Sequence, residues 1–192
     1  VAIRTASSTL DPLQMVFIRN VFSFLFLLPF ALYHGISSLK TERFGRHFIR
    51  AFIGLIAMES WFYALMHLPV NTATALSFTA PLFSTIFAVL LLRERIGCLR
   101  ALLIGFGGVL VVANPFAAEA WNIYAAIVLA SASFMAVAGI LVKTLTKTEA
   151  SWKIVLYMSF LMSLMSLPFA LPVWETPDID SLSVLALIAA LA

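Results

Sequence analysis

Residues 120–142 read AWNIYAAIVLASASFMAVAGILV and contain no charged side chain. A helix that rises 1.5 Å per residue needs about 20 apolar residues to cross a hydrocarbon core about 30 Å thick. Backbone groups inside lipid must form their hydrogen bonds within the segment. A run of this length and composition therefore predicts a transmembrane helix.

Similar apolar runs occur on both sides of this one, joined by short connections that contain Pro or Gly. The sequence predicts further spans, the fourth of them shorter than the others, at residues 13–33, 48–68, 70–92, 96–113 and 154–173. Residues 181–192 look like the first half of another span, and residues 1–9 like the end of an earlier one. Because the chain starts without Met and stops inside an apolar run, we expect both ends to be truncations.

The composition supports a membrane protein. Hydrophobic residues make up 62% of the 192 residues and charged residues 11%, and the mean hydropathy is +1.04. A soluble domain carries about 25% charged residues, because its surface faces water. The net charge of +3 does not indicate a nucleic-acid partner, since no patch combines basic with aromatic residues.

The positive charges gather in alternate connections. Ten of the twelve Lys and Arg residues fall in the segments 40–50, 93–100 and 143–153. The connections between these segments, at 67–72, 114–120 and 172–181, hold none. Positively charged loops stay in the cytoplasm. The three basic segments are therefore predicted to be cytoplasmic, in a plasma membrane that we expect to be a bacterial inner membrane.

An internal repeat appears when the sequence is shifted by 139 residues. The pentapeptide LPFAL at 28–32 recurs at 167–171, and Arg4 falls on Lys143. Five spans separate the two copies, so the copies cross the membrane in opposite directions. Inverted repeats of this kind are a recurrent design of secondary transporters.

The repeat predicts an all-α fold with two inverted repeats of five helices, and ten helices in the complete protein. The first repeat would be residues 1–114 and the second 115–192. This chain would then run from the end of helix 1 to the start of helix 8.

Several motifs together resemble the EamA domain of the drug/metabolite transporter superfamily. The segments that carry the resemblance are WFYAL at 61–65, LPVNTATAL at 68–76, APLF at 80–83 and RER at 93–95. The features that resemble the family's hallmarks are Arg19 in helix 2, Pro81 within helix 4, Glu94 and Arg95 just after it, and Gly105, Gly107 and Gly108 in helix 5.

The resemblance implies a secondary transporter that moves a small organic metabolite by alternating access, with no enzyme activity and no cofactor. The solute would be an amino acid, a nucleoside or a cofactor-like compound. Segments 61–63 and 72–78 are similar to bacterial uptake proteins for cofactor-like metabolites. In the family, helices 3 and 4 help to wall the central cavity.

Arg19 and Glu59 are the charges that lie well inside predicted spans. An unpaired charge at a helix centre costs at least about 2.5–3.5 kcal/mol, so each needs a partner or water. Their similar depths predict that they pair or share a polar network. Glu59 could bind a cationic group of the solute or a coupling proton. Alternatively, the pair could only fix two helices together.

Other candidates for the substrate pathway are polar or aromatic, although helix packing would explain each of them equally well. On helix 4 they are Asn71, Thr74, Ser77, Phe78 and Pro81, and on helix 3 Trp61 and Tyr63, which could stack on a ring-bearing solute. We assign structural roles to Glu94, Arg95, Gly105 and Gly108. The three histidines, at positions 34, 47 and 67, are too scattered for a metal site and are expected to anchor span ends at the interface.

Two other classes of protein, intramembrane enzymes and channels, have different sequence features. An intramembrane enzyme would need a constellation such as His-Glu-x-x-His or the Gly-x-Ser-x-Gly elbow, and neither occurs. A channel would need a selectivity filter or rings of like charge. The inverted repeat favours a carrier over both.

Overall fold

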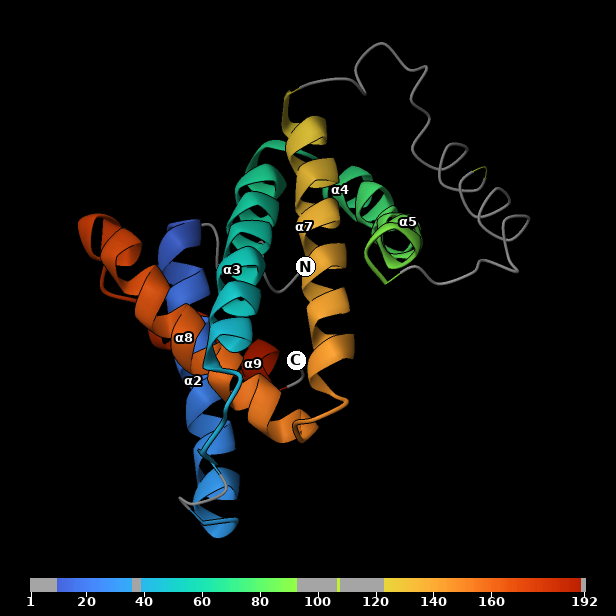
Figure 1. Ribbon diagram of the computed structural model, residues 1–192. Helices are drawn as coiled ribbons and strands as arrows, with labels where there is room; N and C mark the ends of the chain where they lie inside the picture. Colours follow the sequence, from blue (N-terminus) through green and yellow to red (C-terminus); the bar gives the residue numbers. More distant parts are fainter. Residues whose placement is uncertain (1–9, 36–38, 93–106, 108–122, 191–192) are drawn as a thin grey trace. The chain divides into compact units, whose positions relative to one another are not determined.

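The computed structural model describes residues 10–35, 39–92, 107 and 123–190. Within these residues the chain forms helices and no strand. The helices in chain order (Figure 1) are α2 (Pro12–Tyr33), α3 (Phe44–His67), α4 (Val70–Ser77), α5 (Ala80–Leu92), α7 (Ile123–Leu145), α8 (Ser151–Ala170), the short 3-10 helix η2 (Leu171–Val173) and α9 (Ile179–Ala190).

Five described segments are long and apolar enough to cross a membrane. They are Pro12–Tyr33, Phe44–His67, Val70–Leu90, Ile123–Leu145 and Ser151–Val173. Five of the predicted spans are therefore confirmed, with ends that differ by up to four residues. The predicted spans at 1–9 and 96–113 lie outside the described residues.

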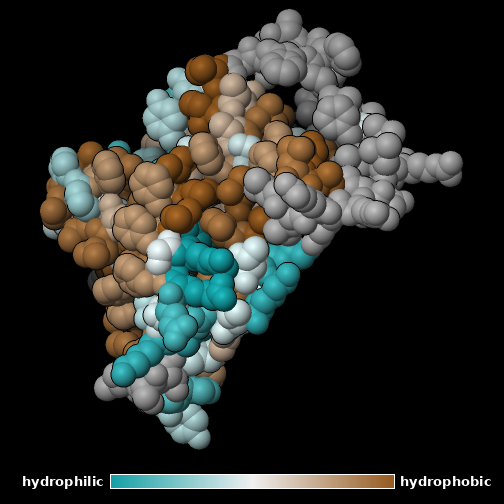
Figure 2. Space-filling view, in the orientation of Figure 1, coloured by the Kyte–Doolittle hydropathy of each residue, from teal (hydrophilic) through white to brown (hydrophobic). Residues whose placement is uncertain are grey.

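The surface of these helices is suited to lipid. Large apolar side chains are about half exposed, for example Leu25 at 49%, Phe52 at 51% and Leu164 at 58%. Figure 2 shows hydrophobic residues, in brown, over much of the visible face. Apolar area in water costs about 25 cal/mol per Å², so a surface of this kind requires an apolar solvent.

The contacts divide the chain into two compact units. One consists of Val1–Leu55 with Val142–Ala192, and the other of Ile56–Leu141. These units do not coincide with the repeats predicted at 1–114 and 115–192, and that division stays a prediction. Each unit is described by itself below.

The first unit is built on two long antiparallel helices, α2 and α8 (Figure 1). Phe17 near the start of α2 packs edge-on against Trp174, just beyond the end of α8, with ring centroids 5.9 Å apart. Phe30 near the end of α2 packs against Trp152 at the start of α8, at 5.8 Å. Early residues of one helix thus meet late residues of the other.

The two helices also match each other along the sequence. α2 begins at Pro12 and α8 begins at Ser151, and these positions differ by the 139 residues of the internal repeat. Each helix contains a proline near its end, Pro29 in α2 and Pro168 in α8, again 139 residues apart. The repeated sequence therefore forms the same local structure twice, in opposite directions.

In the second unit, the later part of α3 packs against α7. Ser131 of α7 is fully buried, and its hydroxyl donates a hydrogen bond of 2.6 Å to the backbone carbonyl of Ala57 on α3. Near the end of α3, the ring of His67 stacks on Tyr124 of α7 with a centroid distance of 4.2 Å. One polar contact and one ring contact therefore join the two helices.

The span predicted at residues 70–92 is not one continuous helix, and that prediction is wrong in this respect. α4 ends at Ser77 and α5 begins at Ala80. The hydroxyl of Thr79 between them donates to the carbonyl of Leu76 at 2.7 Å. Pro81 accounts for the break, because a proline cannot donate a hydrogen bond to the carbonyl four residues before it and its ring clashes with that carbonyl.

The predicted role of Pro81 changes with this break. Pro81 is the second residue of α5, where a helix has no need of the missing N–H group. The expected position of Pro81 in the interior of helix 4 is therefore wrong. Pro81 instead starts a new helix partway through the span.

Candidate functional site

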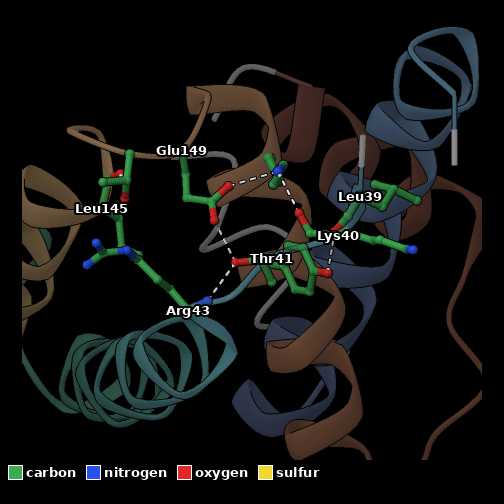
Figure 3. A network of polar contacts seen from close by, with 9 residues as sticks. Leu39, Lys40, Thr41, Arg43, Leu145 and Glu149 are labelled. Atoms are coloured by element: carbon green, nitrogen blue, oxygen red, sulfur yellow. Dashed lines mark hydrogen bonds and ion pairs between the residues drawn. The ribbon is translucent and has the colours of Figure 1, made fainter. Parts of the chain in front are cut away.

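A network of polar contacts joins the connection before α3 to the start of α8 (Figure 3). The hydroxyl of Thr41 donates to Oε1 of Glu149 at 2.6 Å and accepts a hydrogen bond from the backbone N–H of Arg43 at 3.0 Å. Nζ of Lys153 forms an ion pair of 2.8 Å with Oε2 of Glu149. The same Nζ donates to the carbonyl of Lys40 at 3.0 Å. Both oxygens of Glu149 are thus engaged.

These contacts place two of the basic segments at one end of the first unit. Residues 40–50 and 143–153 meet through Thr41 and Glu149, as expected of two loops on one side of a membrane. The third basic segment, 93–100, lies outside the described residues. The side of the membrane that this end faces stays a prediction.

The environment of Glu149 lowers its pKa below the ordinary value of 4.5. Burial by itself would raise the pKa. Hydrogen bonds from Lys153 and Thr41, together with the charges of Lys153 and His47, outweigh that effect. Glu149 is therefore a carboxylate at neutral pH, and it holds the two segments together.

His47 lies next to this network and is 1% exposed. Its ring stacks on Tyr157 with a centroid distance of 4.8 Å and an angle of 29° between the planes. The hydroxyl of Tyr157 donates to the carbonyl of Leu39 at 2.7 Å. The prediction that His47 anchors a span end at the interface is wrong, because α3 begins four residues earlier than expected and draws His47 into the bundle.

The other two histidines fit that prediction better. Nδ1 of His34 lies 3.0 Å from the carbonyl of Phe30, and Nδ1 of His67 lies 3.0 Å from the carbonyl of Tyr63. Both histidines are exposed at helix ends. Among the residues that the structure describes, no group of three His, Cys, Asp or Glu side chains could hold a metal ion.

Arg50, one turn after His47, points deeper along α3. Its Nη1 atom lies 3.9 Å from the position that a Cβ would occupy on Gly54, and Sδ of Met162 lies 3.8 Å from the same position. Nε and Nη1 of Arg50 and both ring nitrogens of His47 are buried and have no hydrogen-bond partner within the described part of the chain. The sequence placed Arg50 just inside a predicted span, among the basic residues of segment 40–50, and assigned it no role in a site. Gly54, four residues after Arg50, is the feature of the sequence that could have indicated room for a buried arginine side chain.

A pair of hydrogen bonds also joins two segments at the other end of the first unit. Gln14 is fully buried near the start of α2. Its amide donates to the carbonyl of Glu175 at 2.5 Å, and its carbonyl accepts from the backbone N–H of Glu175 at 3.1 Å. This pair of hydrogen bonds, which ties α2 to the segment after α8, was not foreseen from the sequence.

Arg19 and Glu59 are placed individually but not as a pair. Arg19 is half-buried on α2, and Glu59 is half-buried on α3. The two residues belong to different units. Their predicted pairing therefore stays a prediction.

The aromatic candidates of α3 differ in their surroundings. Trp61 is half-buried and packs edge-on against Phe62 at 5.6 Å, as expected of a packing residue. Tyr63 is 48% exposed, and its ring lies 4.9 Å from His67 and 6.2 Å from Tyr124. Of the two, Tyr63 presents the more accessible ring.

The hydroxyl groups of the predicted polar stripe bond to carbonyls nearby in the chain. Thr74 donates to Val70 at 2.6 Å, and Ser77 donates to Thr74 at 2.7 Å. The remaining candidates of the stripe are exposed: Asn71, Phe78 and Pro81. Glu94, Arg95, Gly105 and Gly108 lie outside the described residues. Roles for all these residues in transport stay predictions.

These observations define a class of protein, a polytopic helical membrane protein with an internal inverted pair of helices. The model of the EamA-like transporter family matches residues 1–114. The chain belongs to this family. It is a family of transporters rather than enzymes, and it lies within the drug/metabolite transporter superfamily to which the motifs pointed.

Named relatives share most of the chain. An S-adenosylmethionine uptake transporter of Rickettsia prowazekii is 35% identical over 178 residues, which cover 92% of this chain and 60% of the relative. A riboflavin transporter of Vibrio cholerae is 33% identical over 165 residues, or 84% and 55% of the two chains. The pseudopaline exporter CntI of Pseudomonas aeruginosa is 28% identical over 168 residues, or 86% and 59%. The chain thus spans under two thirds of the length of these curated relatives.

Proposed function

We propose that the protein is a secondary transporter that carries a small cofactor-like metabolite across a bacterial inner membrane by alternating access. In this proposal residues 40–50, 93–100 and 143–153 face the cytoplasm. Residues 1–114 form one repeat and residues 115–192 belong to a second, inverted repeat.

The observation that carries the proposal is the pairing of α2 with α8. The two helices begin 139 residues apart, in register with the internal sequence repeat, and they pack against each other in opposite directions. Inverted repeats create two equivalent half-structures, which can expose a central site alternately to either side. The match of the family model to residues 1–114 supports the proposed boundary of the first repeat.

The names of the relatives support the class of solute. Two of them are named as transporters of S-adenosylmethionine and of riboflavin, both of which are cofactors or cofactor precursors with a ring system. We therefore propose a solute that combines a planar ring with polar groups. Tyr63 offers an accessible ring for stacking, and Glu59 offers a carboxylate for a cationic group or a coupling proton.

Uptake into cells tests this proposal. Cells that express the full-length protein should accumulate labelled S-adenosylmethionine or riboflavin with saturation kinetics. Cells that carry the empty vector should not. Saturation with one solute and competition by its unlabelled form would support the proposal. Equal accumulation in both kinds of cell, for both solutes, would contradict the proposed class of solute.

A further inference from the structure

Part of the guanidinium group of Arg50 lies inside the protein, because Nε and Nη1 are buried. An arginine near the end of a membrane helix usually extends its charged group to the interface. A helical side chain also leans toward the start of its own helix, which for Arg50 is the end near the polar network. Nη1 instead lies beside Gly54, four residues in the opposite direction.

This position is close to the middle of the span. Gly54 comes ten residues after Phe44, the first residue of α3, in a helix of 24 residues. At 1.5 Å per residue Gly54 is about 15 Å along α3 from its first residue, and Arg50, at the end of the basic segment 40–50, directs Nη1 toward this inner part of the helix.

The neighbours of Arg50 make this position possible. Gly54 has no side chain, so it leaves room for the guanidinium group. His47, on the turn nearer the network, is buried and stacks on Tyr157 of α8. Met162 of α8 closes the other side, and a methionine adapts readily to a change in its surroundings.

None of these neighbours carries a negative charge that could pair with Arg50. Nε and Nη1 are buried and donate to no partner within the described part of the chain. Glu149, the carboxylate of the adjacent network, is already engaged by Thr41 and Lys153. Buried donors are almost always satisfied in working proteins, and a planar guanidinium matches a carboxylate or a phosphate through two parallel hydrogen bonds.

We propose that Arg50, with His47 beside it, binds the carboxylate or phosphate group of the transported solute beside Gly54 of α3. Binding requires the contact between α3 and α8 at Met162 to open, because protein atoms cover the two nitrogens in this structure. The anionic group of the solute then accepts the hydrogen bonds that Nε and Nη1 of Arg50 make to no group in the described part of the chain. This inference rests on the proposed function and adds the requirement that the solute carries a carboxylate or a phosphate group.

Two pairs of compounds test the inference, because the members of each pair differ by one anionic group. S-adenosylmethionine is compared with its decarboxylated form, and flavin mononucleotide with riboflavin. Binding to the purified full-length protein is measured by titration calorimetry. The wild type should bind the anionic member of at least one pair at least about tenfold more tightly, as expected for a charge-assisted pair of hydrogen bonds.

Arg50→Gln should reduce that preference to less than about threefold, and Arg50→Lys should restore part of it. Arg46→Gln is the matched control, because Arg46 is an exposed arginine on the same helix, and it should leave the preference unchanged. If Arg50→Gln does not fold, the Lys variant and Gly54→Leu provide the comparison. If the ratio of the two affinities within each pair is the same in these variants as in the wild type, the inference is overturned.

The anionic group could also come from a lipid. In a second arm, the protein is titrated with phosphatidylglycerol in detergent micelles. Stabilisation of the wild type but not of Arg50→Gln by this lipid, with no preference within either solute pair, would assign the site to a headgroup and overturn the inference. Transport of a solute without any preference for its anionic form would leave the proposed function in place and overturn only this inference.

Discussion

Nη1 of Arg50 lies 3.9 Å from the position of a Cβ on Gly54. A charged group and a missing side chain therefore occupy the same part of α3, near the middle of the span. A contact of this length is ordinary van der Waals packing, so a single methyl group fits there. A larger side chain does not.

This geometry predicts a graded effect of size at position 54. Gly54→Ala should retain most of the transport rate, whereas Gly54→Leu should displace the guanidinium group of Arg50 and reduce the rate at least about tenfold. Initial uptake rates in proteoliposomes measure both. Gly139→Leu is the control, because a Cβ at Gly139 meets nothing within 4 Å, and it should have no effect. Equal losses in the Ala and Leu variants would contradict the account.

The polar network at the base of α8 predicts a loss of stability in Thr41→Val. The substitution removes the hydrogen bond from Thr41 to Glu149 and keeps the shape of the side chain. We expect a destabilisation of about 1 kcal/mol, seen as a lower melting temperature in detergent. Thr146→Val should change little, because the hydroxyl of Thr146, in the turn after α7, donates to the nearby carbonyl of Lys143 and not to another segment. A wild-type melting temperature in Thr41→Val would show that the network does not stabilise the fold.

The lowered pKa of Glu149 predicts a dependence of stability on pH. A carboxyl group whose pKa is lower in the folded protein than in the unfolded chain stabilises the fold above the unfolded value. That stability is lost as the pH falls from about 4.5, the ordinary value, through the lower folded value. Melting temperatures recorded downward from pH 7 should show this loss in the wild type. Glu149→Gln should show a smaller loss, and an identical profile would refute the assignment.

The contact between α3 and α7 predicts a difference between two serines of one helix. Ser131 donates to the carbonyl of Ala57 on α3, whereas Ser133 donates to Ala130 in its own helix. Ser131→Ala should destabilise the protein by about 0.6 kcal/mol, and Ser133→Ala by much less. Denaturation in mixed micelles measures both. The reverse order would mean that the inter-helix hydrogen bond adds no stability.

Glu59 allows a test of proton coupling. If Glu59 binds a coupling proton, Glu59→Gln should abolish the response of uptake to an imposed pH gradient, because the amide cannot exchange a proton. If Glu59 binds a cation of the solute, the variant should raise KM and keep the response. Glu42→Gln, an exposed glutamate before α3, is the control. An unchanged rate and an unchanged pH dependence in Glu59→Gln would remove Glu59 from the mechanism.

Much of the fold was predictable because lipid imposes strict limits on sequence. The lengths of the apolar runs predicted the five spans. The alternation of basic loops predicted that residues 40–50 and 143–153 lie at the same end of the helices. The shift of 139 residues that relates LPFAL at 28–32 to LPFAL at 167–171 also relates the starts of α2 and α8. These are properties of the solvent and of the repeat, and they need no knowledge of side-chain packing.

The parts that failed depend on local geometry. Hydropathy does not register the break at Phe78 and Thr79, because apolar residues continue through it. Charge counting grouped Arg50 with the basic residues at the end of a span, since it ignores the direction of the side chain. The double hydrogen bond between Gln14 and Glu175 joins residues 161 positions apart, and no local pattern announces a contact of that kind.

Counterflow in proteoliposomes tests the central claim, transport by alternating access, most directly. Vesicles that contain the full-length protein are loaded with unlabelled S-adenosylmethionine, or with riboflavin in a second series, and diluted into a trace of the same labelled compound. A carrier produces a transient accumulation of label above the external concentration, which empty vesicles do not show, and the account predicts this overshoot for at least one solute. Label that rises only to the external concentration for a solute that does enter would indicate a channel and contradict the account.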